Sequence, residues 1–264
     1  MKTPVYNMKG EKSGEVNLAK AFSQPVRQDL IKKAVLYEQS LERQPYGANP
    51  MAGKRTSAHY HGRRGIKHSM MNREMARMKR IHGQGYLNMT ARFVPQSTKG
   101  RKAHPPKAEK IWAKKMNKKE FFKALFSAVS ATGNRDIVGE RGHKIEKIKH
   151  IPLIMDDKFQ ELKKVKEVKE LLHILGFDAE LERAKEKKIR AGKGKLRGRK
   201  YVKKKGPLIV VSDYKGLEKA GKNLAGVDIV SVKDLTVQLL APGTHPGRLC
   251  IWTKSAMEAV DKMN

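Results

Sequence analysis

Cysteine is almost absent from this 264-residue chain, which contains only Cys250. A single cysteine excludes a disulfide within the chain and any metal site built from several cysteines. Long apolar runs are also missing: no stretch of about 18 apolar residues occurs, so no membrane-spanning helix is expected. The first residues, MKTPVYNMKGEK, lack the apolar core of a secretory signal. These absences favour an intracellular protein, soluble or held in a complex, without a membrane partner.

Acidic residues are scarce relative to basic ones. The chain has 26 Asp and Glu against 58 Lys and Arg, a formal net charge of +32. A compact domain with that charge repels itself unless a polyanion neutralises it, and in a cell the usual polyanion is nucleic acid. Residues 45–119 hold 19 basic and 2 acidic residues, residues 187–206 hold 11 and none, and the remaining 169 residues carry only +4. We therefore predict a nearly neutral body with two basic insertions.

Outside the insertions, short apolar runs alternate with amphipathic stretches. The runs that predict strands are TPVYNM and GEVNL near the start, then PLIM (152–155), PLIVVSD (207–213), VDIVSV (227–232) and RLCIWT (248–253). The helical stretches between the later runs include one with apolar residues from Leu162 to Leu175, which Gly176 can end. This alternation is typical of an α/β fold, a mainly parallel sheet with helices on both faces.

Two further helices are predicted in the body. The first spans 26–41 and buries a face formed by Leu30, Ile31, Ala34, Val35 and Leu41. The second is FFKALFSAVSA, with a capping box from Asn117 to Glu120 ahead of it and Gly133 as its stop.

Residues 45–117 have no sustained apolar period. NREMARMKR (72–80) is predicted as a short helix, with Met71, Met75 and Met78 packing against an apolar surface. We predict a single α/β domain over 1–264, interrupted by an extended loop at 45–117 and carrying a second basic loop at 187–206. A loop of this length in a compact domain is either disordered or functional.

The residue types in both loops suit RNA. Arginine forks and lysine ammonium groups bind phosphates, glycines allow a close backbone approach, and Tyr46, Tyr60, Tyr86 and Phe93 can stack on unpaired bases. A solvated disordered loop is the alternative, but the interspersed Tyr, Phe and Met favour an ordered segment. The candidate RNA-binding residues are Lys54, Arg55, Arg63, Arg64, Lys67, Arg73, Arg77, Lys79, Arg80, Arg92, Lys99, Arg101, Lys102, His104, Lys107, Lys193, Lys195, Arg197, Arg199 and Lys200.

Few sequence motifs in this chain match those of enzyme active sites or cofactor-binding sites. GLEKAGKN (216–223) nearly matches a phosphate loop, but Asn223 replaces the Ser or Thr that would hold magnesium. His59, His61 and His68 offer nitrogen ligands without an accompanying carboxylate or cysteine, so RNA contacts are favoured over a metal site. Cys250 with His245 is a poor nucleophile pair, and Asp156 with Asp157 suits helix capping. We expect no catalysis, metal, cofactor or small-molecule substrate. A general RNA chaperone or DNA-binding protein stays open.

Several stretches resemble one known family in their order along the chain. They are TPVYNMKGEKSGEVNL, FSQPVRQDLIKKAV, FVPQSTKGRKAHPPKAEK (93–110), RGHKIEKIKHIPLIMDD (141–157), AGKGKLRGRKY (191–201), NLAGVDIV (223–230) and LAPGTHPGRLCIWT (240–253). Together they resemble the L-four family of large-subunit ribosomal proteins in its archaeal form. The resemblance covers nearly the whole chain.

The resemblance implies a globular α/β domain on the outside of the large ribosomal subunit and a long loop that runs into the ribosomal RNA. It also implies that the loop supports subunit assembly and lines part of the polypeptide exit tunnel near its tip, between Arg63 and Arg92. Expected partners are large-subunit ribosomal RNA, neighbouring ribosomal proteins and the passing nascent polypeptide, in the cytoplasm. The tunnel-lining candidates are Arg77, Arg80, His82, Gln84, Tyr86 and Met89.

Overall fold

The computed structural model describes residues 2–83 and 85–263, which divide into two compact units. One unit comprises Met1–Glu42 and Ala113–Asn264 and is called the body below. The other, Arg43–Trp112, is called the basic segment. Gln84, one of the tunnel-lining candidates, lies outside the described residues.

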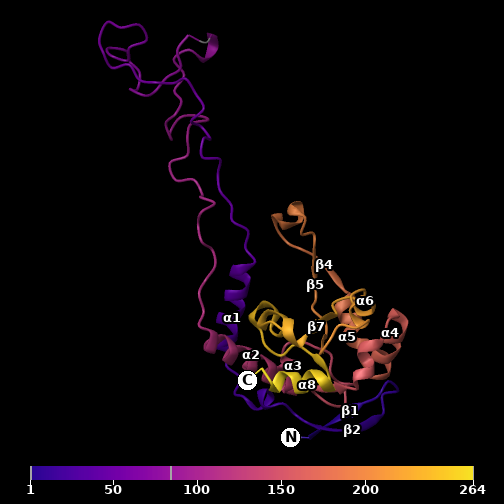
Figure 1. The fold of residues 1–264 in the computed structure, drawn as a ribbon. Coiled ribbons are helices and arrows are strands. Elements are labelled where there is room, and N and C mark those ends of the chain that lie inside the picture. Colours follow the sequence, from indigo (N-terminus) through magenta and orange to yellow (C-terminus); the bar gives the residue numbers. More distant parts are fainter. Residues whose placement is uncertain (1, 84, 264) are drawn as a thin grey trace. The chain divides into compact units, whose positions relative to one another are not determined.

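A six-stranded sheet forms the centre of the body, with strand order β2-β1-β3-β8-β6-β7. Its strands β1, β2 and β7 are labelled in Figure 1. Every neighbouring pair is parallel except β1 and β2, which form an antiparallel hairpin at one edge. In the register of the central strands, Ile209 lies opposite both Ile251 and Ile229. The strands are β1 (Lys2–Tyr6), β2 (Lys12–Asn17), β3 (Leu153–Met155), β6 (Leu208–Val211), β7 (Asp228–Ser231) and β8 (Cys250–Thr253).

Two apolar clusters cover the two faces of this sheet. Leu208 and Val210 belong to one cluster, and Ile209 and Val211 belong to the other, because successive side chains on a strand point to opposite faces. The first cluster includes residues of α1 (Gln28–Leu41), α2 (Lys118–Gly133), α7 (Val237–Leu240) and α8 (Lys254–Asp261). The second includes residues of α3 (Arg135–Glu140), α4 (Val165–Ile174), α5 (Asp178–Lys185) and α6 (Leu217–Gly221). The predicted α/β class is therefore confirmed.

Single-turn helices complete the body: η1 (Lys20–Ser23), η3 (Asp157–Glu161), η5 (Val232–Asp234) and η6 (Pro242–Thr244). Asp156 accepts a hydrogen bond from the Asp157 amide at 2.8 Å and so caps η3, as the sequence predicts. Within the described residues, no helix combines the length and the apolar character needed to cross a membrane.

Two local predictions about helices are wrong. Leu41, the last residue of α1, is 54% exposed, whereas Ile31, Ala34 and Val35 are fully buried. The last turn of the helix is held by polar contacts instead, since the buried Ser40 hydroxyl accepts from the Lys114 amide at 2.9 Å. Asn117 stands at the start of α2 but its side chain makes no capping hydrogen bond. Glu120 instead forms an ion pair with Lys33 of α1 at 2.6 Å, so the expected capping box is replaced by a contact between helices.

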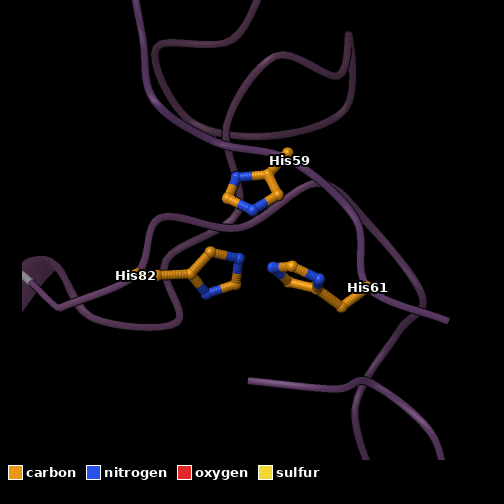
Figure 2. A group of neighbouring side chains, drawn as sticks. All are labelled: His59, His61 and His82. Carbon is orange, nitrogen blue, oxygen red and sulfur yellow. The ribbon is translucent and has the colours of Figure 1, made fainter. Parts of the chain in front are cut away.

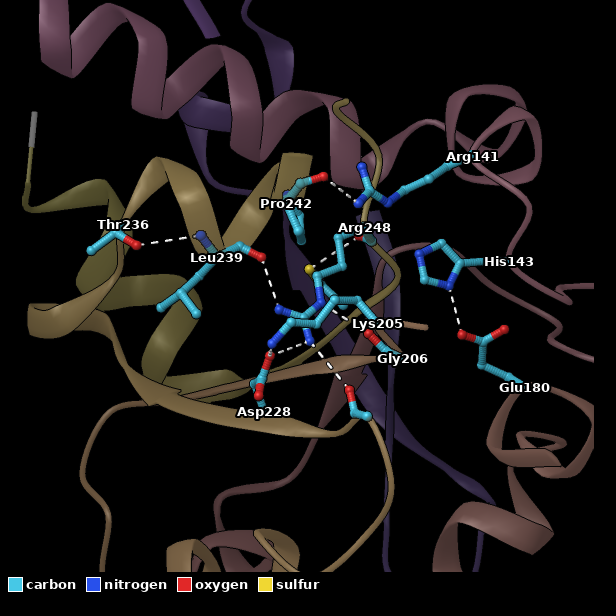
Figure 3. A network of polar contacts seen from close by, with 12 residues as sticks. Arg141, His143, Glu180, Lys205, Gly206, Asp228, Thr236, Leu239, Pro242 and Arg248 are labelled. Carbon is cyan, nitrogen blue, oxygen red and sulfur yellow. Dashed lines mark hydrogen bonds and ion pairs between the residues drawn. The ribbon is translucent and has the colours of Figure 1, made fainter. Parts of the chain in front are cut away.

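A fully buried arginine ties the ends of β6, β7 and β8 together (Figure 3). The Arg248 guanidinium donates to Asp228 at 2.6 Å, to the Gly206 carbonyl at 2.9 Å and to the Leu239 carbonyl at 3.0 Å. Burial disfavours the charge of Asp228, but the attraction and hydrogen bonding of Arg248 outweigh it and lower the pKa of Asp228. A buried charge is tolerated only when paired and hydrogen-bonded, as Arg248 is here.

Glu180 is the second buried charge of the body. It accepts hydrogen bonds from Arg183 at 2.6 Å, His143 at 2.7 Å and the Lys144 amide at 3.0 Å. Burial opposes its negative charge, but these donors outweigh burial and lower the pKa of Glu180 to about 2. Burial also lowers the pKa of His143. Because an ionised Glu180 carboxylate can only accept, His143 donates to it from Nδ1.

Replacing Glu180 by glutamine tests this network. The folded pKa of Glu180 lies below its ordinary value of 4.5, so ionised Glu180 stabilises the fold above pH 4.5. That stabilisation disappears as the pH falls from 4.5 to about 2. We expect Glu180→Gln to lower the free energy of unfolding by about 3 kcal/mol at pH 7, and by much less near pH 2. Denaturant unfolding followed by far-ultraviolet circular dichroism measures both values.

The matched control is Glu15→Gln, since Glu15 is exposed and forms none of the ion pairs found among the described residues. It should change the stability by a few tenths of a kcal/mol at either pH. A difference between wild type and Glu180→Gln that stays constant from pH 7 to pH 2 would contradict the assignment of a buried, ionised Glu180.

Candidate RNA interface

The outgoing and returning strands of the basic segment lie against each other. The Ala48 amide donates to the Pro106 carbonyl at 3.0 Å, within the returning stretch TKGRKAHPPKAEK. Gly53 has a φ of +71°, and a Cβ at this position would come within 2.5 Å of the Gly100 carbonyl oxygen. Only glycine suits such a conformation and approach. Gly53 therefore lets the outgoing stretch run in contact with the returning stretch at Gly100.

An aromatic clamp lies where the two strands begin and end. The rings of Tyr46 and Trp112 are stacked, with centroids 5.6 Å apart. The Arg43 guanidinium lies 3.8 Å from the Trp112 ring centroid, and the Lys110 ammonium lies 4.3 Å from it. Such cation–π contacts stabilise by about 0.5–1 kcal/mol each at exposed sites. They link the start of the basic segment, at Arg43 and Tyr46, to its end, at Lys110 and Trp112.

Three short stretches pair at the other end of the segment. Arg80 forms an antiparallel β-bridge with His59 on one side and a second antiparallel β-bridge with Ala91 on the other. Its guanidinium donates to the Met89 carbonyl at 2.8 Å and to the Ala76 carbonyl at 2.9 Å. Arg80 is 9% exposed, so this candidate for RNA and tunnel contact has its donors directed into the segment. We call this end, residues 57–92, the tip.

The tip contains no helix at 72–80, so that prediction is wrong. The amides of Met75 and Met78 instead donate to carbonyls only two residues earlier, and Asn72 has a φ of +57°. Met75 is exposed, and Met71 and Met78 are half-buried. Met70, which the helical spacing did not select, is buried together with Ile81. The Arg80 guanidinium binds the Ala76 carbonyl, which in a helix would accept a hydrogen bond from the backbone amide four residues later.

The second insertion forms a hairpin of the body rather than an irregular loop. It pairs β4 (Lys187–Ile189) with β5 (Tyr201–Lys203) in antiparallel register, with a turn of helix at Lys193–Arg197. Every residue of both strands is exposed, and Leu196 near the turn is 87% exposed. A two-stranded hairpin without a buried face is marginally stable in water. In Figure 1 the hairpin extends beyond α5 and α6.

The described basic residues of the basic segment are not paired with its two acidic residues, Glu74 and Glu109. Within the residues described there, no ion pair forms, whereas the body contains pairs such as Arg248–Asp228 and Lys33–Glu120. Among the RNA-binding candidates, Arg80 is buried, Arg92 and Arg101 are half-buried, and all the others are exposed. Arg55, Arg92 and Lys99 line one hollow of about 540 Å³, so the structure brings together candidates that lie 44 positions apart.

The tunnel-lining candidates fall into different environments. Tyr86 is 94% exposed, and Arg77 is exposed. Met89 is half-buried with a φ of +60°. His82 is also half-buried, and its ring contacts the rings of His59, His61 and His68. Burial and these neighbours lower the pKa of His82. Sequence reasoning missed this cluster because His82 lies 21 positions beyond His61.

The nucleotide-site alternative is not supported by the body. Residues 217–221 form helix α6 with Leu217 and Ala220 buried, where a phosphate-cradling loop would be required. Cys250 is also no nucleophile, since burial raises the pKa of its thiol to about 12 and the thiol donates to the Arg248 carbonyl at 3.2 Å. Both observations agree with the expectations from the sequence.

Comparison with known proteins gives full-length matches. The large ribosomal subunit protein uL4 of Archaeoglobus fulgidus is 48% identical over 263 residues, covering 98% of this chain and 97% of its own. The same protein of Methanococcus aeolicus is 48% identical, covering 99% of both chains. That of Nanoarchaeum equitans is 47% identical, covering 98% of this chain and 97% of its own.

The chain also matches the family described as the ribosomal protein L4/L1 family, over residues 16–263. The relatives are archaeal ribosomal proteins and not enzymes, so the expected absence of catalysis is confirmed by the family. The resemblance seen in the sequence is confirmed as well. A match along nearly the whole length, with relatives almost half identical, shows that this chain belongs to the ribosomal protein L4/L1 family.

Proposed function

We propose that this chain is a structural protein of the large ribosomal subunit in the cytoplasm, and that it binds large-subunit ribosomal RNA through the basic segment and the β4–β5 hairpin. Exposed, uncompensated positive charge carries this proposal. Arg43–Trp112 contains 16 Lys and Arg and two acidic residues, without an ion pair among its described residues. RNA phosphates would supply the missing negative charge, with release of their counterions.

In this proposal the nearly neutral body supplies the stable fold and the two basic insertions bind RNA. The body folds around its own sheet and two apolar clusters, while the extended loop at 45–117 and the second basic insertion at 187–206 contact RNA and support assembly. The hollow lined by Arg55, Arg92 and Lys99 offers two guanidinium forks and an ammonium to one phosphate or nucleotide. Exposed Leu196 and the neighbouring lysines of the hairpin suit an RNA groove or a neighbouring ribosomal protein.

The tip of the basic segment lines part of the polypeptide exit tunnel in this proposal. Tyr86 and Arg77 are the exposed candidates and would meet the nascent chain or the RNA of the tunnel wall. Arg80 instead maintains the shape of the tip, because both of its terminal nitrogens bind carbonyls within it.

Charge removal in the tip should weaken RNA binding in a salt-dependent way. Arg63→Gln with Arg64→Gln removes two exposed charges, and each lost phosphate contact reduces the slope of log affinity against log salt by about 0.7–0.9. We expect a loss of about 1.5 in slope for a large-subunit ribosomal RNA fragment. Fluorescence anisotropy titrations at several salt concentrations measure it.

Lys166→Gln with Lys169→Gln is the matched control, since both lysines are exposed on α4 of the body. This variant should bind with the wild-type slope. Equal slopes for the two double variants would argue against the basic segment as the RNA interface. Wild-type binding to transfer RNA as tight as to the ribosomal fragment would support a general RNA chaperone instead.

A deletion tests the division of labour. Removing residues 48–107 joins Gly47 to Ala108, which already lie side by side, since a Cβ on Gly47 would come within 2.5 Å of the Ala108 amide nitrogen. The body should keep its circular dichroism and cooperative unfolding, because its core contains no residue of the deleted range. In cells, the shortened chain should fail to support assembly of normal large subunits.

The informative comparison is with the full-length chain expressed at the same level. Loss of the folded body on deletion would show that the basic segment is part of the folding unit. Normal incorporation of the shortened chain into active subunits would show that the segment is dispensable for assembly.

A further inference from the structure

Three histidines of the tip gather around one point (Figure 2). One ring nitrogen from each of His59, His61 and His82 lies within 4.8 Å of those of the other two. The ring centroids are 4.3 Å apart for His59 and His61, 4.5 Å for His59 and His82, and 4.9 Å for His61 and His82. A fourth ring, that of His68, lies 4.7 Å from His82. Figure 2 shows the three labelled rings pointing toward one another.

Backbone hydrogen bonds within the tip hold the three histidines in position. His59 and His61 are two residues apart on an extended stretch, so their side chains leave the same side of it. His59 exchanges two backbone hydrogen bonds with Arg80, at 3.1 and 3.2 Å. The Ile81 amide donates to the Thr90 carbonyl, which holds the start of His82 in place. The His61 carbonyl accepts from the Met70 amide at 3.0 Å. All three ligand positions are thus held by pairing within the tip.

The hydrogen bonds of the rings leave nitrogens free for a ligand. His82 has both ring nitrogens buried and without a hydrogen-bond partner. Such orphaned polar atoms are uncommon in folded proteins and mark a missing partner. His59 Nδ1 lies 2.9 Å from the Ser57 carbonyl oxygen, to which it can only donate. That bond leaves the lone pair on Nε2 of His59, and metal-binding histidines are typically oriented by a bond of this kind.

We propose that His59, His61 and His82 bind one divalent transition-metal ion of the zinc class, with His68 placed to supply a fourth nitrogen. Imidazole is the ligand that zinc, copper and nickel ions share, while magnesium and calcium prefer oxygen. Zn²⁺ holds nitrogen at about 2.0–2.1 Å in tetrahedral geometry, which places ligand nitrogens about 3.3 Å apart. Because the three nitrogens already lie within 4.8 Å of one another, they need to approach by at most about 1.5 Å, which side-chain rotation can supply.

The proposed role of the ion is structural. It would link residues 59–61 to residue 82 and close the loop between them, which contains the exposed cations Arg63, Arg64, Arg73 and Arg77. A cross-link of this kind removes conformational freedom from the open chain. The apolar cluster of the tip is small and its burial contributes little stability, so a bound metal ion would stabilise the folded tip. The proposal stands independently of ribosome binding, because all the ligands come from this chain.

Metal titration of the purified full-length chain tests the proposal. After treatment with a chelator and transfer to high salt, ZnCl₂ alone is added in a calorimeter, and Co²⁺ serves as a spectroscopic substitute. We expect one Zn²⁺ per chain and visible Co²⁺ bands typical of tetrahedral nitrogen coordination. His82→Gln and His61→Gln should each weaken binding at least about tenfold, whereas His104→Gln, an exposed histidine outside the cluster, should bind as the wild type does.

His61→Gln guards against a trivial loss of structure. Only the backbone carbonyl of His61 pairs within the tip, so this variant keeps the bridge between His59 and Arg80. The absence of a stoichiometric Zn²⁺ site in the wild type would overturn the proposal. Equal weakening by His61→Gln and His104→Gln, or no weakening by either His61→Gln or His82→Gln, would overturn it as well, since both results describe binding by scattered histidines.

Discussion

The two units of this protein differ in whether their charged side chains form ion pairs. In the body, buried Arg248 is paired with Asp228 and buried Glu180 with Arg183, and each pair has further hydrogen bonds that compensate for lost water. In the basic segment the described cations have no acidic partners, and its buried apolar side chains are few: Ala58, Met70 and Ile81. The body thus contains the partners of its own buried charges, whereas the contacts within the segment are chiefly ring stacking and the hydrogen bonds of Arg80. In the proposed function, ribosomal RNA supplies the negative charge that the segment lacks.

Residues of the body hold the end of the second insertion in place. Gly206 follows the hairpin, and its carbonyl accepts from the buried Arg248 guanidinium, while Lys205 pairs with Asp228 at 3.0 Å. Arg183 of α5 donates to the Lys205 carbonyl at 2.7 Å. The end of the hairpin is thus held by Arg248 and by Arg183, the partner of buried Glu180, and the lysines and arginines of its strands are exposed. Structural residues and candidate RNA-binding residues are neighbours in sequence here but differ in burial and pairing.

The sequence predicted the sheet and most helices because apolar periodicity follows burial directly. PLIVV and LCIW became β6 and β8, and the helix to Leu175 ended before Gly176 as expected. Sequence reasoning failed where contacts between distant residues decide the outcome. Glu120 pairs with Lys33 rather than capping its own helix, and Arg80 forms β-bridges with His59 and Ala91 instead of ending a helix at 72–80. The histidine cluster was missed for the same reason, because chain spacing does not reveal that His82 folds back onto His59.

Sedimentation of a cell lysate in a high-salt gradient tests the central claim most directly. High salt removes proteins that are held only by nonspecific attraction to phosphates. If the basic segment and the hairpin are locked into folded ribosomal RNA, this chain should stay with the large subunit in the gradient. Release of the chain to the top fractions, while the subunit itself stays intact, would contradict the account and favour a loosely bound RNA chaperone.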